Sequence, residues 1–184
     1  ITNKEQQKGN VKNVDYTNYE EGIYVGYRYF DSFNKEVSYP FGYGLSYTIF
    51  AFSDASVKKV GSDWKVAVKV TNTGKVAGKE VAQVYIKAAS GDVKKPVCEL
   101  KAFGKTQLLA PGQSEILTLS IKTADLASFN ETRSAWVVDA GNYTALIGAS
   151  VVDIRQSVKF SVDKPQITEV HNVLKMKNPI NRMK

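Results

Sequence analysis

Apolar and polar residues alternate strictly through the middle of this chain. In Trp64-Lys65-Val66-Ala67-Val68-Lys69-Val70 the large apolar side chains occupy the even positions and the lysines fall between them. The same two-residue period returns in residues 82–86, 117–121, 143–147 and 158–162. This period is typical of β-strands that bury one face and expose the other.

Turn-forming residues separate these runs, as in Asn72-Thr73-Gly74, Ser90-Gly91-Asp92, Pro111-Gly112 and Ala140-Gly141-Asn142. Two further apolar runs, at residues 52–60 and 97–109, bring the number of expected strands to seven. Only residues 123–128 suggest a helical turn. The pattern predicts an all-β fold: a seven-stranded immunoglobulin-like or fibronectin type III-like sandwich over residues 52–162.

A different composition precedes the sandwich, in residues 20–51, which we call the aromatic segment. Eight of the ten tyrosines lie between Tyr16 and Phe52. The segment is too rich in glycine for a regular helix, so we predict that it is extended. Exposure of so many rings would create a larger apolar patch than soluble proteins normally carry.

The rings of the aromatic segment therefore require a partner, and two kinds are possible. They could stack on sugar rings, or they could dock on protein that lies outside this chain, and we favour docking. Gly42 and Gly44 would allow another backbone to approach closely. The candidate docking residues are Tyr24, Tyr27, Arg28, Tyr29, Phe41, Tyr43 and Tyr47.

Charge and hydropathy argue against two classes of partner. The net charge is +7, but it arises from lysines scattered along the chain and a basic tail at residues 163–184, not from a dense basic stripe. We therefore expect no nucleic-acid partner. The apolar runs are far shorter than a membrane span, so we expect no membrane partner either.

Residues 1–19 form a polar strap, which we expect to be a linker or the end of a preceding domain.

Residue types that carry catalysis are scarce. Cys98 is the single cysteine and His171 the single histidine, which excludes a disulfide framework, histidine triads and multi-histidine metal sites within these 184 residues. Hydrolysis of a glycosidic bond needs two suitably spaced carboxylates. Glu20 and Glu21 are adjacent, and Asp31 and Glu36 are close in sequence, but neither pair has a pocket-forming context. We predict no cofactor, no metal and no catalytic residue in this chain.

Two stretches of the aromatic segment are distinctive: Glu21-Gly22-Ile23-Tyr24-Val25-Gly26-Tyr27-Arg28-Tyr29-Phe30-Asp31 and Tyr39-Pro40-Phe41-Gly42-Tyr43-Gly44-Leu45-Ser46-Tyr47. They resemble the segment that joins the last two domains of glycoside hydrolase family 3 enzymes. The terminal fibronectin type III-like domain of that family resembles Val70–Gly74, Gly78–Tyr85, Pro96–Phe103, Leu108–Gly112 and Asp139–Ser150. The resemblance covers about residues 20–162.

The resemblance implies an enzyme that is β-glucosidase-like, retaining and exo-acting. A barrel domain and an α/β sandwich domain would precede this chain, and would supply an aspartate nucleophile and a glutamate acid/base. The partners of the chain would be these two upstream domains, which also bind the β-glucoside or oligosaccharide substrate. The chain itself would clamp them together without catalytic residues of its own. The resemblance also implies a periplasmic or extracellular location.

One triplet of the sequence is misleading. Ser62-Asp63-Trp64 spells the sequence that commonly surrounds the family's nucleophile, but here it follows the Gly61 turn and enters a sandwich strand. We interpret Asp63 as a turn residue and Trp64 as a core residue.

Two alternatives to the hydrolase function stay open: a carbohydrate-binding or adhesion module, and a secreted sandwich that binds only protein. The choice among glucosides, xylosides and related sugars would be made by the upstream domains.

Overall fold

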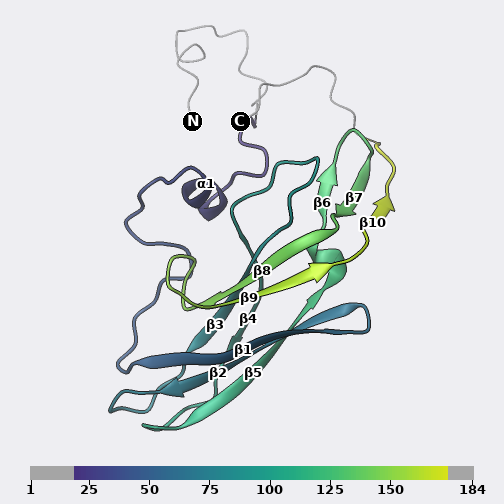
Figure 1. Ribbon diagram of the computed structural model, residues 1–184. Coiled ribbons are helices and arrows are strands. Elements are labelled where there is room, and N and C mark those ends of the chain that lie inside the picture. The colour runs from purple at the N-terminus through teal and green to yellow at the C-terminus, as the bar shows by residue number, and fades with distance from the viewer. Residues whose placement is uncertain (1–18, 174–184) are drawn as a thin grey trace, which may run out of the picture.

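The computed structural model describes residues 19–173 as a sandwich of two antiparallel sheets. One sheet has three strands in the order β1-β2-β5, and the other has four in the order β4-β3-β8-β9 (Figure 1). The strands of the first sheet are β1 (Phe50–Val60), β2 (Asp63–Asn72) and β5 (Ser114–Lys122). Those of the second are β3 (Val81–Lys87), β4 (Glu99–Lys105), β8 (Gly141–Gly148) and β9 (Ile154–Val162).

Alternating side chains from the two sheets meet in one hydrophobic core. Val66, Val68 and Val70 of β2 are almost completely buried, and so are Ala82, Val84 and Ile86 of β3. Trp64 lies at the start of this series, with its ring 4.5 Å from that of Phe160 on β9. The prediction that Trp64 is a core residue is confirmed. Asp63 is the first residue of β2, just after the turn at Gly61 and Ser62.

The prediction of a seven-stranded sandwich is confirmed, because each predicted run corresponds to one strand of these two sheets. The predicted helical turn is a 3-10 helix, η2 (Thr123–Leu126). A third sheet was not expected from the sequence. It consists of β6 (Ser128–Asn130), β7 (Ala135–Val138) and β10 (Gln166–Glu169), in the order β10-β7-β6. Strands of three or four residues are too short for alternation to reveal them.

The ends of the chain differ in how far the structure describes them. Residues 166–169, which the sequence analysis placed in the basic tail, form β10 and pair with β7. The rest of the predicted tail beyond residue 173 lies outside the described residues. The predicted polar strap also lies outside them, apart from Tyr19.

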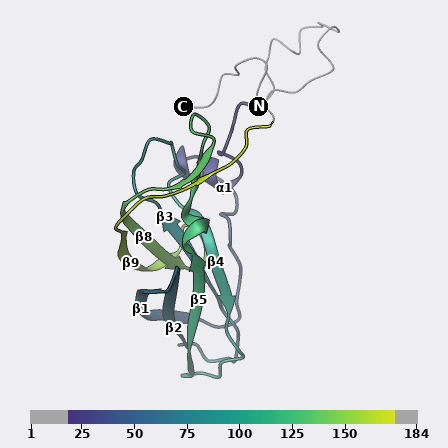
Figure 2. The same ribbon diagram turned by 90° about the vertical axis from the view of Figure 1, so that its right-hand side faces the viewer.

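The aromatic segment runs along the outer face of the four-stranded sheet (Figure 2). The prediction that it is extended throughout was wrong over six residues, because Tyr27–Ser32 form the helix α1. The glycines lie outside this helix, and Gly26 precedes it with a φ of 59°, a conformation that glycine adopts readily. The segment covers a second, smaller apolar cluster on the sheet, formed by Tyr85, Cys98 and Val151.

Candidate functional site: the aromatic segment and the sheet beneath it

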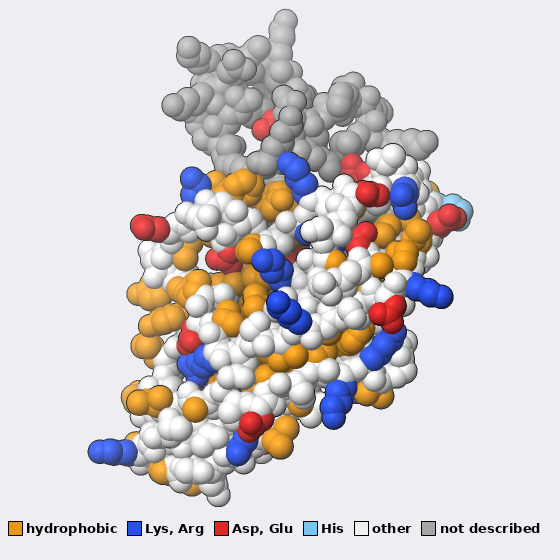
Figure 3. Space-filling view, in the orientation of Figure 1, with side chains coloured by type: hydrophobic (Ala, Val, Ile, Leu, Met, Phe, Trp, Pro, Cys, Tyr) orange, Lys and Arg blue, Asp and Glu red, His pale blue; other side chains and the backbone are white. Residues whose placement is uncertain are grey.

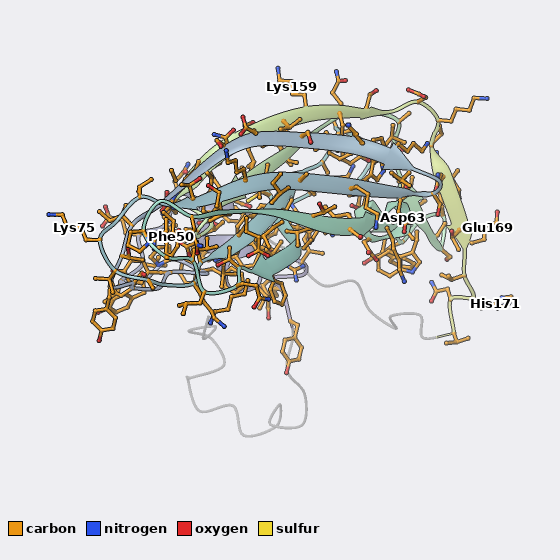
Figure 4. The ribbon with its side chains drawn as sticks, turned by 90° about the horizontal axis from the view of Figure 1, so that it is seen from below. Phe50, Asp63, Lys75, Lys159, Glu169 and His171 are labelled. Carbon is orange, nitrogen blue, oxygen red and sulfur yellow. The ribbon has the colours of Figure 1, made fainter. Side chains whose placement is uncertain are left out.

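Within residues 19–173, no three histidine, cysteine, aspartate or glutamate side chains are grouped so that they could hold a metal ion. No helix in this part of the chain has the length and apolar character needed to cross a bilayer. Asp63 lies at the opposite end of the sandwich from Phe50, where the aromatic segment enters β1 (Figure 4). Its carboxylate accepts a hydrogen bond from the hydroxyl of Ser62 at 3.1 Å.

Tyr27 fixes α1 to the sandwich. Its ring stacks on that of Phe41 with centroids 4.4 Å apart, and it meets the ring of Tyr85 edge-on at 6.1 Å. Its hydroxyl oxygen accepts a hydrogen bond from the backbone N–H of Leu100 at 2.8 Å. Burial raises the pKa of Tyr27, because the ionised phenolate would lose its hydration. Tyr27 and Phe41 therefore join the two halves of the aromatic segment and hold them on the sheet.

The other candidate residues of the first half contact neighbours within the chain. Arg28 forms an ion pair with Glu99 of β4 at 3.4 Å. Tyr24 and Tyr29 both contact the ring of Phe33, with centroids 5.0 Å and 5.1 Å apart. These three residues were predicted to dock on other domains. Within this chain Arg28 joins α1 to β4, and the two tyrosines pack inside the aromatic segment; docking on other domains stays a prediction for all three.

Gln83 holds the second half of the aromatic segment on the sheet. Its Nε2 donates hydrogen bonds to the carbonyl oxygens of Gly42 at 3.1 Å and Ala149 at 2.6 Å. Its Oε1 accepts a hydrogen bond from the hydroxyl of Tyr85 at 2.6 Å. Every polar atom of the Gln83 amide is thus engaged in the partly buried space between segment and sheet.

Gly42 is required by this arrangement, while Gly44 is not. Gly42 has a φ of 82°, and a Cβ at this position would lie only 2.0 Å from Oε1 of Gln83. Gly42 therefore permits the close approach of a side chain from its own chain. No atom lies within 4 Å of a Cβ built on Gly44, so that position is open.

Beyond this attachment, the side chains of the segment point away from the sandwich. Tyr47 is 100% exposed, Leu45 is 89% exposed, and Tyr43 is 50% exposed. Tyr39 and Ile49 are also largely exposed. In Figure 3 hydrophobic side chains gather along the margin where the segment descends from α1 toward β1. We call Tyr39, Tyr43, Leu45, Tyr47 and Ile49 the exposed stripe.

A hollow of about 730 Å³ lies between the exposed stripe and the adjoining edge of the sandwich. Its walls include Tyr43 and Leu45 from the segment, and charged residues from the sandwich line it too. These are Lys79, Glu80, Lys105, Asp153 and Arg155. The hollow therefore combines an apolar wall with a charged one, which suits contact with a protein surface of mixed character.

Sequence reasoning missed several residues that shape this face. Phe103 on β4 lies directly opposite Gln83 in the sheet and is 69% exposed. It therefore extends the apolar surface onto the sheet itself. The alternation within residues 97–109 could have revealed Phe103 as an outward-facing ring. Gln83 and Tyr85 carried no such signal, because their burial depends on a segment forty residues away.

Asp31 is an acidic candidate whose side chain is only partly exposed. Its Oδ2 is shielded from solvent and has no hydrogen-bond partner among the described residues. Burial raises the pKa of Asp31, since the charged form has lost its hydration. Glu36, which the sequence brought close to Asp31, is exposed. The two carboxylates therefore have different environments: Asp31 lines a hollow of about 410 Å³, and Glu36 is not among the residues that line it.

Comparison with known proteins identifies relatives of this region. The fibronectin type III-like domain family matches residues 80–151. A β-glucosidase of Ruminococcus albus is 39% identical over 181 residues, which are 95% of this chain and 19% of that protein. Two structures agree in fold.

The structure of β-glucosidase 3B from Thermotoga neapolitana in complex with glucose is 52% identical, with a TM-score of 0.80, over 83% of this chain and 21% of that one. The GH3 β-glucosidase of Bifidobacterium adolescentis is 34% identical, with a TM-score of 0.76, over 95% of this chain and 26% of that one. The chain spans about a fifth of the length of the curated relatives that it matches.

Proposed function

This chain carries the fibronectin type III-like, C-terminal region of glycoside hydrolase family 3 β-glucosidases, and on that premise we propose that it docks on the catalytic domains of such an enzyme. The complete enzyme would hydrolyse β-linked glucosides with retention of configuration. Its nucleophilic aspartate and its glutamate acid/base would belong to the upstream domains. The present chain would hold those domains in place.

The exposed stripe is the observation that carries this proposal. Its five apolar side chains lie in water while the backbone that bears them is fixed to the sheet through Gln83 and Phe41. The amide of Val151 donates a hydrogen bond to the carbonyl of Phe41 at 3.0 Å, which adds a second attachment. A fixed apolar stripe has already lost conformational entropy, so covering it with protein gains hydrophobic free energy at little further cost.

The composition of the stripe also fits a protein partner. Three of its members are tyrosines, which combine an apolar ring with a hydroxyl that can form hydrogen bonds in a buried interface. The charged wall of the adjacent hollow would supply polar contacts at the rim of that interface.

A carbohydrate-binding or adhesion module is not favoured, because the relatives are hydrolases in which this region is a minor part. The two functions make different forecasts for the isolated chain. A binding module would bind a soluble β-linked oligosaccharide by itself, whereas a docking module would not. Titration calorimetry with cello-oligosaccharides distinguishes them.

Replacement of Tyr47 tests the docking proposal. Because Tyr47 is 100% exposed, Tyr47→Ala should leave the melting temperature of the 184-residue chain unchanged. In the complete enzyme it should lower the stability of the docked arrangement by about 2 kcal/mol, as for a tyrosine at the centre of an interface. Thermal unfolding of both proteins, with and without the substitution, measures the difference.

Ile116→Ala is the matched control, because Ile116 is 67% exposed on the outer face of the other sheet. Ile116→Ala should change the melting temperature of neither the 184-residue chain nor the complete enzyme. Equal shifts for Tyr47→Ala in the chain and in the complete enzyme, or no shift in either, would contradict docking through the stripe.

A further inference from the structure

Asp31, whose Oδ2 is shielded from solvent and has no hydrogen-bond partner among the described residues, lines a second hollow beside the aromatic segment. This hollow has a volume of about 410 Å³, which is enough for a large side chain. Cys98, Leu146 and Val151 form part of its wall. Phe30, Val97 and Val152 also line it and are partly exposed, at 37%, 44% and 65%. Apolar side chains at the hollow are therefore exposed to solvent.

A buried acceptor without a partner is unfavourable. Desolvation of a polar group without a compensating hydrogen bond opposes folding, and the penalty is larger for a charged group. Lys35 and Lys87 also line the hollow, but neither forms an ion pair with Asp31 among the described residues. The neighbouring Tyr85 and Cys98 are themselves buried; burial raises the pKa of both, and the charge of Asp31 adds a smaller contribution in the same direction. Nothing in the described part of the chain compensates the carboxylate.

We propose that Asp31 accepts a hydrogen bond from a side-chain N–H donor of the upstream catalytic domains, which enters this hollow when the domains assemble. The inference rests on the docking function proposed above. It adds one polar contact to the docked interface, the hydrogen bond to Asp31, which we call the anchor. The donor belongs to the upstream domains because the chain is only about a fifth as long as its relatives. The apolar rim of the hollow also continues the surface of the aromatic segment, to which Phe30 and Asp31 both belong.

Asp31→Leu tests the inference, because leucine has the same branched shape as aspartate but no acceptor. In the isolated chain the substitution removes an unpartnered buried carboxylate, so the melting temperature should rise or stay unchanged. In the complete enzyme it leaves the incoming donor without an acceptor, so the melting temperature should fall. The expected result is thus opposite behaviour of the same substitution in the two proteins. An effect of leucine on the stability of α1 would act equally in both.

Asp163→Leu is the control, since Asp163 is an exposed carboxylate next to the end of β9. Asp163→Leu should change the melting temperature of the isolated chain and of the complete enzyme by the same amount. Hydrogen exchange supplies a second measurement. Peptides that cover residues 28–36 and 95–101 should exchange more slowly in the complete enzyme than in the isolated chain, and Asp31→Leu should reduce that protection.

The possible outcomes separate this inference from the docking function. If Tyr47→Ala destabilises only the complete enzyme while Asp31→Leu changes neither protein, docking stands and the anchor is overturned. If Asp31→Leu destabilises both proteins equally, its partner belongs to this chain. If calcium chloride stabilises the isolated chain and Asp31→Leu abolishes that effect, the hollow binds a cation instead, and the inference is again overturned.

Discussion

The amide of Gln83 on β3 holds the backbone of Gly42, which lies 41 residues earlier in the chain, through a hydrogen bond of 3.1 Å. The same nitrogen reaches the carbonyl of Ala149, and Tyr85 donates to the amide oxygen. One side chain therefore connects the aromatic segment, the central strand β3 and the loop after β8. The position of the exposed stripe depends on this connection.

Gln83→Leu should release this part of the segment. The substitution leaves the carbonyls of Gly42 and Ala149 and the hydroxyl of Tyr85 without their partner, at an expected cost of about 1–3 kcal/mol. Hydrogen exchange of a peptide covering residues 41–48 should accelerate, and chemical unfolding should begin at lower denaturant. Gln166→Leu, at an exposed position on β10, should do neither. Equal effects of the two variants would show that the Gln83 bonds do not stabilise the segment.

Trp64→Ala should destabilise the sandwich by about 3–5 kcal/mol, the usual range for truncation of a large aromatic core residue. Trp64 is 5% exposed and packs on Phe160. Trp64→Phe should cost less, because it keeps a ring in place and removes an indole N–H that has no hydrogen-bond partner among the described residues. Urea unfolding followed by circular dichroism measures both.

Asp63→Ala should cost less than about 1 kcal/mol and leave the activity of the complete enzyme intact, because Asp63 is the first residue of β2, at one end of the sandwich. Loss of activity with normal folding would identify Asp63 as a nucleophile, contrary to our interpretation of the Ser62-Asp63-Trp64 triplet.

Alkaline pH should destabilise the chain partly through Cys98. Burial raises the pKa of its thiol from 9.0 to about 11, so the folded protein keeps the thiol neutral where the unfolded chain ionises it. The resulting stabilisation is complete below pH 9 and is lost as the pH rises from about 9 to about 11. Cys98→Ala should therefore show a smaller fall in unfolding free energy over this interval. An unchanged fall would assign the effect to other groups, such as Tyr143, whose pKa burial raises to about 12.

The isolated chain should not hydrolyse aryl β-glucosides, because its sequence contains no pair of carboxylates in a pocket-forming context and only one histidine. An assay with a nitrophenyl β-glucoside should give the rate of the blank. Turnover that copurifies with the chain, and that persists after contaminating glucosidases are removed, would refute this expectation.

The amino-acid sequence by itself determined the sandwich. Alternation in segments such as residues 64–70 reports which face of a strand is buried, and this information is local because neighbouring side chains point to opposite faces. The order of the motifs along the chain also indicated the family, because each motif consists of residues that are neighbours in the sequence. The lone Cys98 and His171 limited the chemistry available.

Only the tertiary structure divided the aromatic segment into an attached part and an exposed part. Tyr27 and Tyr47 look alike in the sequence, yet Tyr27 packs against Phe41 and Tyr85 while Tyr47 is wholly exposed. Tyr85 lies between Val84 and Ile86 and so faces away from the main core, yet it is completely buried, with Tyr27 of α1 packed edge-on against its ring. Burial of this kind results from contacts between residues 40 to 70 positions apart, and the period of a single strand carries no information about what folds over its outer face.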